Sequence, residues 1–271
     1  MSRGLFYAIA TVAVIATVAA VLAFQSGRSD SGGSTFGGKD DPVLDAKVRT
    51  LQFYDWEPNV IGPGGRPAPD DPRVTGGANA GKAGALALYD AVLRAAQRPA
   101  AIDADNGRAG SLFFAVDRAR RRVIGRAAAT RARALAGAPA GATVHEVRPG
   151  TAIVAADGST SRFYVIEDDV AISGANIREA RQGTDQSTGR PVTLFAFDDT
   201  GLALFRRLTK AIAARGSQSS LNNVGDPPAQ HNQHFAVVYD GAIVTAPAVD
   251  FRRSPDGLDA RAGTQLAEQL P

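Results

Sequence analysis

The chain has 271 residues, 44% of them hydrophobic, so it is long enough for one large domain or two small ones with a buried core. It contains no cysteine, which excludes a disulfide framework, a thiol nucleophile and a thiolate metal site. The net charge is only +3, and this balance does not require a nucleic-acid partner.

The N-terminal segment is apolar. An uncharged run of 20 residues begins at Leu5 and ends at Phe24. As a helix it would span ~30 Å, the thickness of a bilayer's hydrocarbon core. This length favours a retained transmembrane signal anchor over a cleaved signal peptide, whose apolar part usually has ~7–15 residues. Residues 1–4 then form a cytoplasmic tip, and the Gly- and Ser-rich residues 25–42 form a flexible linker.

Residues 43–150 are predicted to form an N-terminal lobe. The patterns indicate a strand at 48–54, a turn-rich loop at 57–77, a helix at 82–97, and strands at 112–116 and 143–147. Seven arginines follow the second strand, on a turn and an alanine-rich helix: Arg118, Arg120, Arg121, Arg122, Arg126, Arg131 and Arg133. This run is either a solvated basic face or a surface for anionic headgroups.

Residues 151–271 are predicted to form a second lobe. Its expected elements are strands at 152–155, 162–166 and 192–197, a helix from 202 to 215, a hairpin within 234–247, and a last helix at 262–270. Strands and helices interleave along the whole chain, and hairpins are present. We therefore predict an α+β fold, with antiparallel-sheet lobes and packed helices after the transmembrane helix.

The helix of the second lobe has clear local signals. Leu202, Phe205, Leu208 and Ile212 recur every three or four residues and form one apolar stripe. Asp198, Asp199 or Thr200 could cap its N-terminus, and Gly216 suits a left-handed stop.

The hairpin is signalled by Asp240-Gly241 between two apolar runs. Pro247 cannot donate a hydrogen bond to a neighbouring strand, so the second arm is expected at a sheet edge or to end in a bulge.

No catalytic, cofactor or metal site is predicted. Residues 76–83 nearly match a phosphate-binding loop but end in Ala83 where a hydroxyl must reach Mg²⁺. Residues 103–107 resemble the start of a calcium loop, but Phe114 occupies the position of the bidentate glutamate. His231 and His234 lack further ligands in sequence, and the Asp168-Asp169 and Asp198-Asp199 pairs suit turns and caps.

A set of motifs carries a family resemblance. They are Ile172-Ser173-Gly174-Ala175-Asn176-Ile177 with Ala180, then Pro191-Val192-Thr193-Leu194-Phe195-Ala196-Phe197, then Asp240-Gly241-Ala242-Ile243-Val244-Thr245-Ala246-Pro247. Their order resembles the large extracytoplasmic domain of the SecD subunit of the bacterial protein-export machinery. Residues 53–60, Phe-Tyr-Asp-Trp-Glu-Pro-Asn-Val, also look like actinobacterial members of that family.

The resemblance implies a non-enzymatic component of protein export, on the extracytoplasmic side of the cell membrane. Its partners would be translocating polypeptides and Sec translocon subunits. With one uncharged hydrophobic span, the chain would be a truncated or diverged member without its own proton-coupling helices. The resemblance assigns possible polypeptide contacts, by strand addition or at an apolar groove, to Ser173, Gly174, Ile177, Phe235, Asp240, Gly241, Val244, Ala246 and Pro247.

A second hypothesis comes from the loop that bears the only tryptophan, Trp56. A Pro- and Gly-rich loop with an aromatic side chain is a reasonable recognition surface. In this alternative the chain is a tethered envelope module that binds a small ligand or a cell-wall component.

Overall fold

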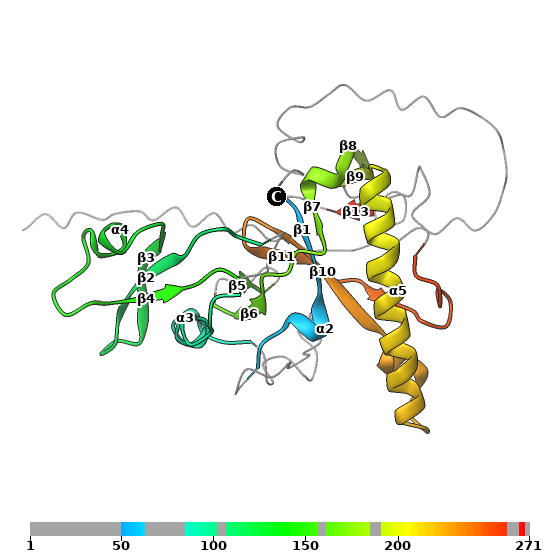
Figure 1. Ribbon diagram of the computed structural model, residues 1–271, viewed down its shortest axis with the longest axis horizontal. Helices are drawn as coiled ribbons and strands as arrows, with labels where there is room; N and C mark the ends of the chain where they lie inside the picture. Colours follow the sequence, from blue (N-terminus) through cyan, green and yellow to red (C-terminus); the bar gives the residue numbers. More distant parts are fainter. Residues whose placement is uncertain are drawn as a thin grey trace, which may run out of the picture.

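The computed structural model describes residues 50–62, 85–101, 107–156, 161–184, 191–258 and 266–268. These residues form three sheets with packed helices (Figure 1), which confirms the mixed α+β class. No helix among them is both long and apolar enough to cross a bilayer. The predicted anchor at 5–24 and the linker at 25–42 lie outside the described residues.

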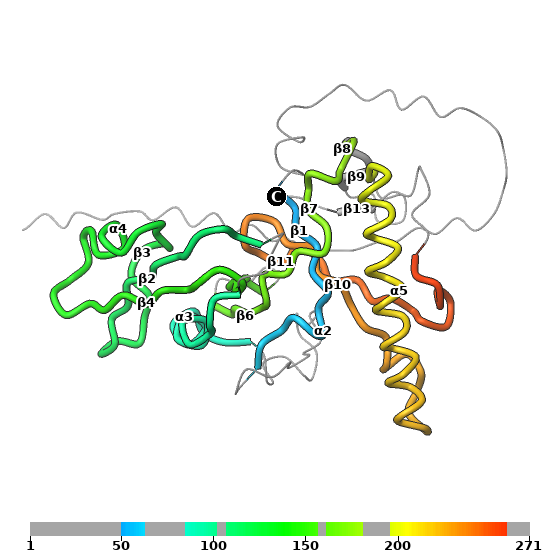
Figure 2. Tube along the Cα trace, in the orientation of Figure 1, coloured from blue at the N-terminus to red at the C-terminus, as the bar shows by residue number. Residues whose placement is uncertain are grey.

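The central sheet has seven strands. Six follow in the order β6 (Phe163–Glu167), β5 (Thr151–Ala155), β11 (Ala242–Thr245), β10 (Gln233–Tyr239), β1 (Gln52–Asp55) and β7 (Ile172–Ser173), and β12 (Ala248–Val249) pairs with β10. The pairs are antiparallel, as predicted, except β5 with β11, which is parallel. In Figure 2 the blue β1 lies beside the orange β10, although the two strands come from opposite ends of the described chain.

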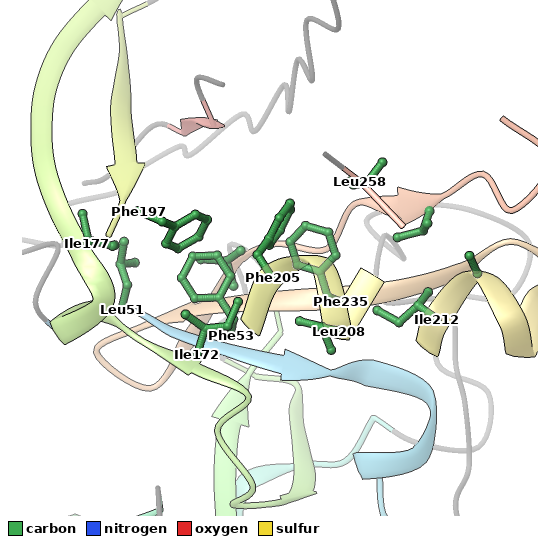
Figure 3. Close-up of a cluster of buried hydrophobic side chains, with 13 residues drawn as sticks. Leu51, Phe53, Ile172, Ile177, Phe197, Phe205, Leu208, Ile212, Phe235 and Leu258 are labelled. Carbon is green, nitrogen blue, oxygen red and sulfur yellow. The ribbon is translucent and has the colours of Figure 1, made fainter. Parts of the chain in front are cut away.

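One face of this sheet is covered by the long helix α5 (Asp199–Asn222). Side chains alternate along β1 and β10, so Phe53 and Phe235 point to the helix face, where Figure 3 shows them beside Phe205. The ring centroids of Phe205 and Phe235 lie 5.5 Å apart in an edge-on arrangement. Burying each aromatic side chain contributes about 1.5–3 kcal/mol, so this cluster holds α5 on the sheet.

The other face of the sheet buries Tyr54, Trp56 and Tyr164. Trp56 begins the short helix α2 (Trp56–Asn59), and its ring packs edge-on against Tyr164 at 4.9 Å. The predicted turn-rich loop therefore starts with a buried helical turn.

α5 confirms the predicted stripe and one of its three possible caps. The Asp198 carboxylate accepts a hydrogen bond from the Gly201 N–H at 2.6 Å, as an N-cap should. The predicted stop at Gly216 is wrong, because the helix continues to Asn222 and Gly216 is buried within it. A side chain at position 216 would collide with the chain beside it, which explains the glycine without a helix end.

A second sheet consists of β8 (Ile177–Thr184), β9 (Pro191–Phe197) and β13 (Leu266–Glu268), with β9 in the middle. The predicted last helix is wrong where it is described, since residues 266–268 form strand β13. They pair with Thr193–Phe195 of β9, and this tertiary pairing overrides the local helix preference.

The third sheet has β2 (Leu112–Asp117) between β3 (Arg122–Ala128) and β4 (Thr143–Val147). Helix α3 (Leu88–Ala96) packs against it, with Tyr89 and Val92 next to Phe114 and Val116. The predicted turn is present at 118–121, but the alanine-rich helix predicted after it is wrong over most of its length: residues 122–128 form strand β3, and only α4 (Arg131–Leu135) is helical. Pairing with β2 decides the strand, and Ile124 at its centre faces Ala115.

Candidate functional site

The nine motif residues fall into two groups. Gly174, Ile177, Phe235, Val244 and Ala246 are buried, and Phe235 is wholly inaccessible. Ser173 and Pro247 are half-buried, while Asp240 and Gly241 are exposed. The buried group builds the core and cannot touch a partner in this conformation, so only the exposed and half-buried positions offer a surface.

The Ser-Gly-Ala-Asn motif joins three elements. It forms β7 and the 3-10 turn η2 (Gly174–Asn176), in which Asn176 Oδ1 accepts from the Ser173 N–H at 3.3 Å. The Gly174 N–H donates to the Leu51 carbonyl at 2.7 Å, and the Asn176 carbonyl accepts from the Asp198 N–H at 2.9 Å. The motif therefore fixes the entry of α5 to the start of β1.

The Asp-Gly hairpin forms as predicted. Asp240 and Gly241 have φ values of 47° and 74°, and two successive positive φ angles are the geometry of a type I′ turn. The Gly241 carbonyl accepts from the Ala155 N–H at 2.8 Å, which ties the turn to β5.

The second arm of the hairpin, predicted to lie at a sheet edge or to end in a bulge, is strand β11, and it is not an edge strand. β11 lies between β10 and β5. The predicted bulge is present: the pairing of β10 with β11 shifts register between Val237 and Val238. At the true edges, β7 has only two residues, and the outer side of β6 is covered by backbone pairing with Ile61 and Leu86. Directly after Pro247, the two-residue β12 pairs with β10 and with no other described strand, so the open edge near Pro247 is only two residues long.

A cluster of charged side chains lies where α2, α5 and β10 meet. Arg215 of α5 donates to the Asp55 carboxylate, and its Nε donates to Gln233 Oε1 at 2.9 Å. The backbone N–H of His234 donates to both carboxylate oxygens of Glu57 at 2.9 Å, and its Nδ1 lies 2.7 Å from Glu57 Oε1. Sequence patterns gave no signal of this cluster, because its partners are 160 and 177 positions apart.

Burial dominates the electrostatics of Asp55. Desolvation raises the pKa of its carboxyl group from 3.8 to about 6, although the charge and hydrogen bond of Arg215 oppose this. Glu57 and Asp169 add smaller increases of the pKa through like-charge repulsion. Asp55 is thus a group that can change its charge in mildly acidic solution.

The other candidate residues have structural partners. His231 Nδ1 lies 3.0 Å from Ser219 Oγ and His234 pairs with Glu57, so each histidine has its own neighbour. Asp168 accepts from the Tyr54 hydroxyl at 2.9 Å and from the Arg108 N–H at 2.8 Å. In the described part of the chain, no three His, Asp or Glu side chains converge as a metal site. Residues 76–83 and 103–106, the phosphate-loop and calcium-loop candidates, lie outside it.

The structure contradicts Trp56 as part of the recognition surface expected at its loop, while residues 63–77 of that loop lie outside the described residues. Trp56 is completely buried in the core behind the central sheet. It has no exposed face to offer a glycan or a small ligand, so the observation that motivated the tethered envelope module is lost.

Taken together, these features define an α+β domain organised by a central sheet, a long covering helix and a β-hairpin. Residues 151–258 match the family model described as SecDF, P1 head subdomain. This match supports a relation to the SecD/SecDF family, a membrane-associated protein-export family with a periplasmic head. No curated protein and no solved structure matches the chain.

Proposed function

We propose that the chain is a membrane-anchored, SecD-like component of protein export. It contacts translocating polypeptides on the extracytoplasmic side, next to subunits of the Sec translocon. The segment from Leu5 to Phe24 holds it in the cell membrane as a single-pass protein, without proton-coupling helices of its own. The observation that carries the proposal is the match of residues 151–258 to the SecDF P1 head subdomain.

The structure supports one version of the contact surface. The tip of the β10–β11 hairpin exposes Asp240 and Gly241, and Tyr239 and Ala242 beside it are half-buried. Its backbone is fixed by the type I′ turn and by the bond from Ala155, so the tip is presented in one orientation. We assign polypeptide contact to this tip and to the half-buried Pro247, while the buried motif residues support them from the core.

Photo-crosslinking tests this assignment. In the first variant a benzophenone amino acid replaces Tyr239, whose aromatic ring it resembles in shape. In the second variant it replaces Ala242. A third variant carries it at Arg252, an exposed position in the turn after β12, and serves as the control. Native membranes are irradiated during active secretion.

Adducts with export intermediates or channel subunits at Tyr239 and Ala242, but not at Arg252, are the expected result. Equal adducts at all three positions, or none at any of them in chains that keep their circular dichroism spectrum, would overturn the assignment.

A further inference from the structure

The strongest charge asymmetry of the described chain lies in the third sheet and its short helix, residues 112–147, which we name the basic lobe. It contains seven arginines and two acidic residues, Asp117 and Glu146, for a net charge of +5. The whole chain has a net charge of +3, so the remaining residues sum to −2. In Figure 1 the basic lobe forms the end of the molecule opposite α5. Such an asymmetry indicates an anionic partner for one end of the molecule.

Three of the seven arginines have partners within the fold. Asp117 pairs with Arg120 at 2.8 Å and lies 4.0 Å from Arg122. Arg121 pairs with Asp90 of α3 at 2.6 Å, and its guanidinium lies over the Tyr89 ring. These pairs anchor the β2–β3 turn, and the lobe's other acidic residue, Glu146, accepts a hydrogen bond from the Ser111 hydroxyl at 2.7 Å.

The other four arginines, Arg118, Arg126, Arg131 and Arg133, have no acidic partner among the described residues. Arg118 also helps to lower the pKa of His145, after the larger effect of burial, so its positive charge acts on the neighbouring strand β4. Unpaired guanidinium groups on the surface attract phosphate groups.

Helix α4 carries two of these four arginines and an exposed apolar side chain. Thr130 caps it by accepting from the Arg133 N–H at 3.2 Å, and Ala134 is its buried residue. Arg131 and Arg133 point away from the core, and Leu135 is 41% exposed beside them. Cationic side chains flanking an exposed aliphatic side chain are typical of segments that lie in the headgroup region of a bilayer.

We propose that the basic lobe docks on an anionic lipid surface, with Arg131 and Arg133 on the lipid phosphates and Leu135 inserted between headgroups. The predicted membrane anchor favours lipid over nucleic acid or an acidic protein, because a short linker keeps the lobe within a few nanometres of the bilayer. The inference rests on that anchor and not on contact with exported polypeptides.

The test uses the full chain reconstituted into phosphatidylcholine vesicles with or without phosphatidylglycerol. Because the chain has no cysteine, Ala132→Cys provides a single site for a fluorescent label on the exposed side of α4. Energy transfer to a dye on the lipid headgroups reports docking. We expect transfer only in vesicles with phosphatidylglycerol, and its loss in 1 M salt, where the Debye length falls to ~3 Å.

Two double variants locate the contact. Each arginine near an anionic surface contributes about fivefold to binding, so Arg131→Gln with Arg133→Gln should lower the ratio of docked to undocked lobes roughly 30-fold. The matched control is Arg206→Gln with Arg207→Gln, which removes two exposed arginines from α5 and should leave docking unchanged.

Several outcomes would overturn the proposal. These are equal transfer in both kinds of vesicle, transfer unaffected by the Arg131 and Arg133 substitutions, or binding of the lobe to nucleic acid or an acidic polypeptide without transfer to anionic vesicles. Crosslinking from Tyr239 is measured in the same variants. Adducts that persist when docking is lost would separate this contact from the export role.

Discussion

Gly216 provides a sharp test of the packing between α5 and its neighbours. A glycine inside an exposed helix normally costs about 1 kcal/mol relative to alanine, so replacement by alanine is usually stabilising. Here an alanine Cβ would lie 2.8 Å from the carbonyl oxygen of His231 and 3.1 Å from Phe251 Cδ1. The first contact is with backbone at the end of η3 (Pro228–His231), which cannot rotate away as a flexible side chain can.

Gly216→Ala should therefore destabilise the fold. Overpacking in a closed contact costs typically 1–3 kcal/mol, against a gain of about 1 kcal/mol in helix propensity, so the free energy of unfolding should fall by up to about 2 kcal/mol. The assay is urea unfolding of the full chain in a mild detergent, followed by helical circular dichroism.

Ala214→Gly is the matched control, because position 214 is exposed on the same helix. It should cost about 1 kcal/mol through propensity alone. If Gly216→Ala instead raises the stability by about 1 kcal/mol while the control behaves as expected, then η3 does not pack against α5 as described.

The electrostatics and the core give two more predictions. The raised pKa of Asp55 means that the folded state holds its proton more tightly than the unfolded state. This stabilisation is complete below pH ~4 and is lost as the pH rises through about 6. The unfolding free energy of the native chain should therefore fall by up to ~3 kcal/mol over this range. That of Asp55→Asn should not fall. If the unfolding free energy of the native chain changes with pH as little as that of the variant, then Arg215 fully compensates the burial of Asp55. Because Trp56 is completely buried, its emission should be blue-shifted, resist quenching by acrylamide and stay unchanged on titration with cell-wall fragments; a saturable change would restore the ligand-binding alternative.

The parts of the fold that the sequence predicts are those determined by short-range chemistry. The Leu202 to Ile212 stripe, the Asp198 cap and the Asp240-Gly241 turn each depend on residues a few positions apart, and all three are present. The strand pair at 152–155 and 162–166 likewise forms β5 and β6.

The errors arise where distant contacts decide. Gly216 looks like a helix stop until the carbonyl of His231 is placed beside it. The arginine run has alanines typical of a helix, but pairing with β2 makes its middle part, residues 122–128, a strand. The charged cluster of Asp55 and Arg215 could not be predicted, since nothing local brings β1 to the C-terminal half of α5.

The same long-range pairing bears on how the chain is divided. The two predicted lobes, 43–150 and 151–271, remain a proposal, but β1 lies between β10 and β7 and its Phe53 packs on Phe197 and Phe235 of the matched segment. A fragment of residues 151–258 alone would lack β1. Its sheet would then have a gap between β10 and β7, and Phe235 would be partly uncovered. A fragment meant to keep this sheet intact therefore has to include β1 and α2, whose Glu57 also holds the start of β10.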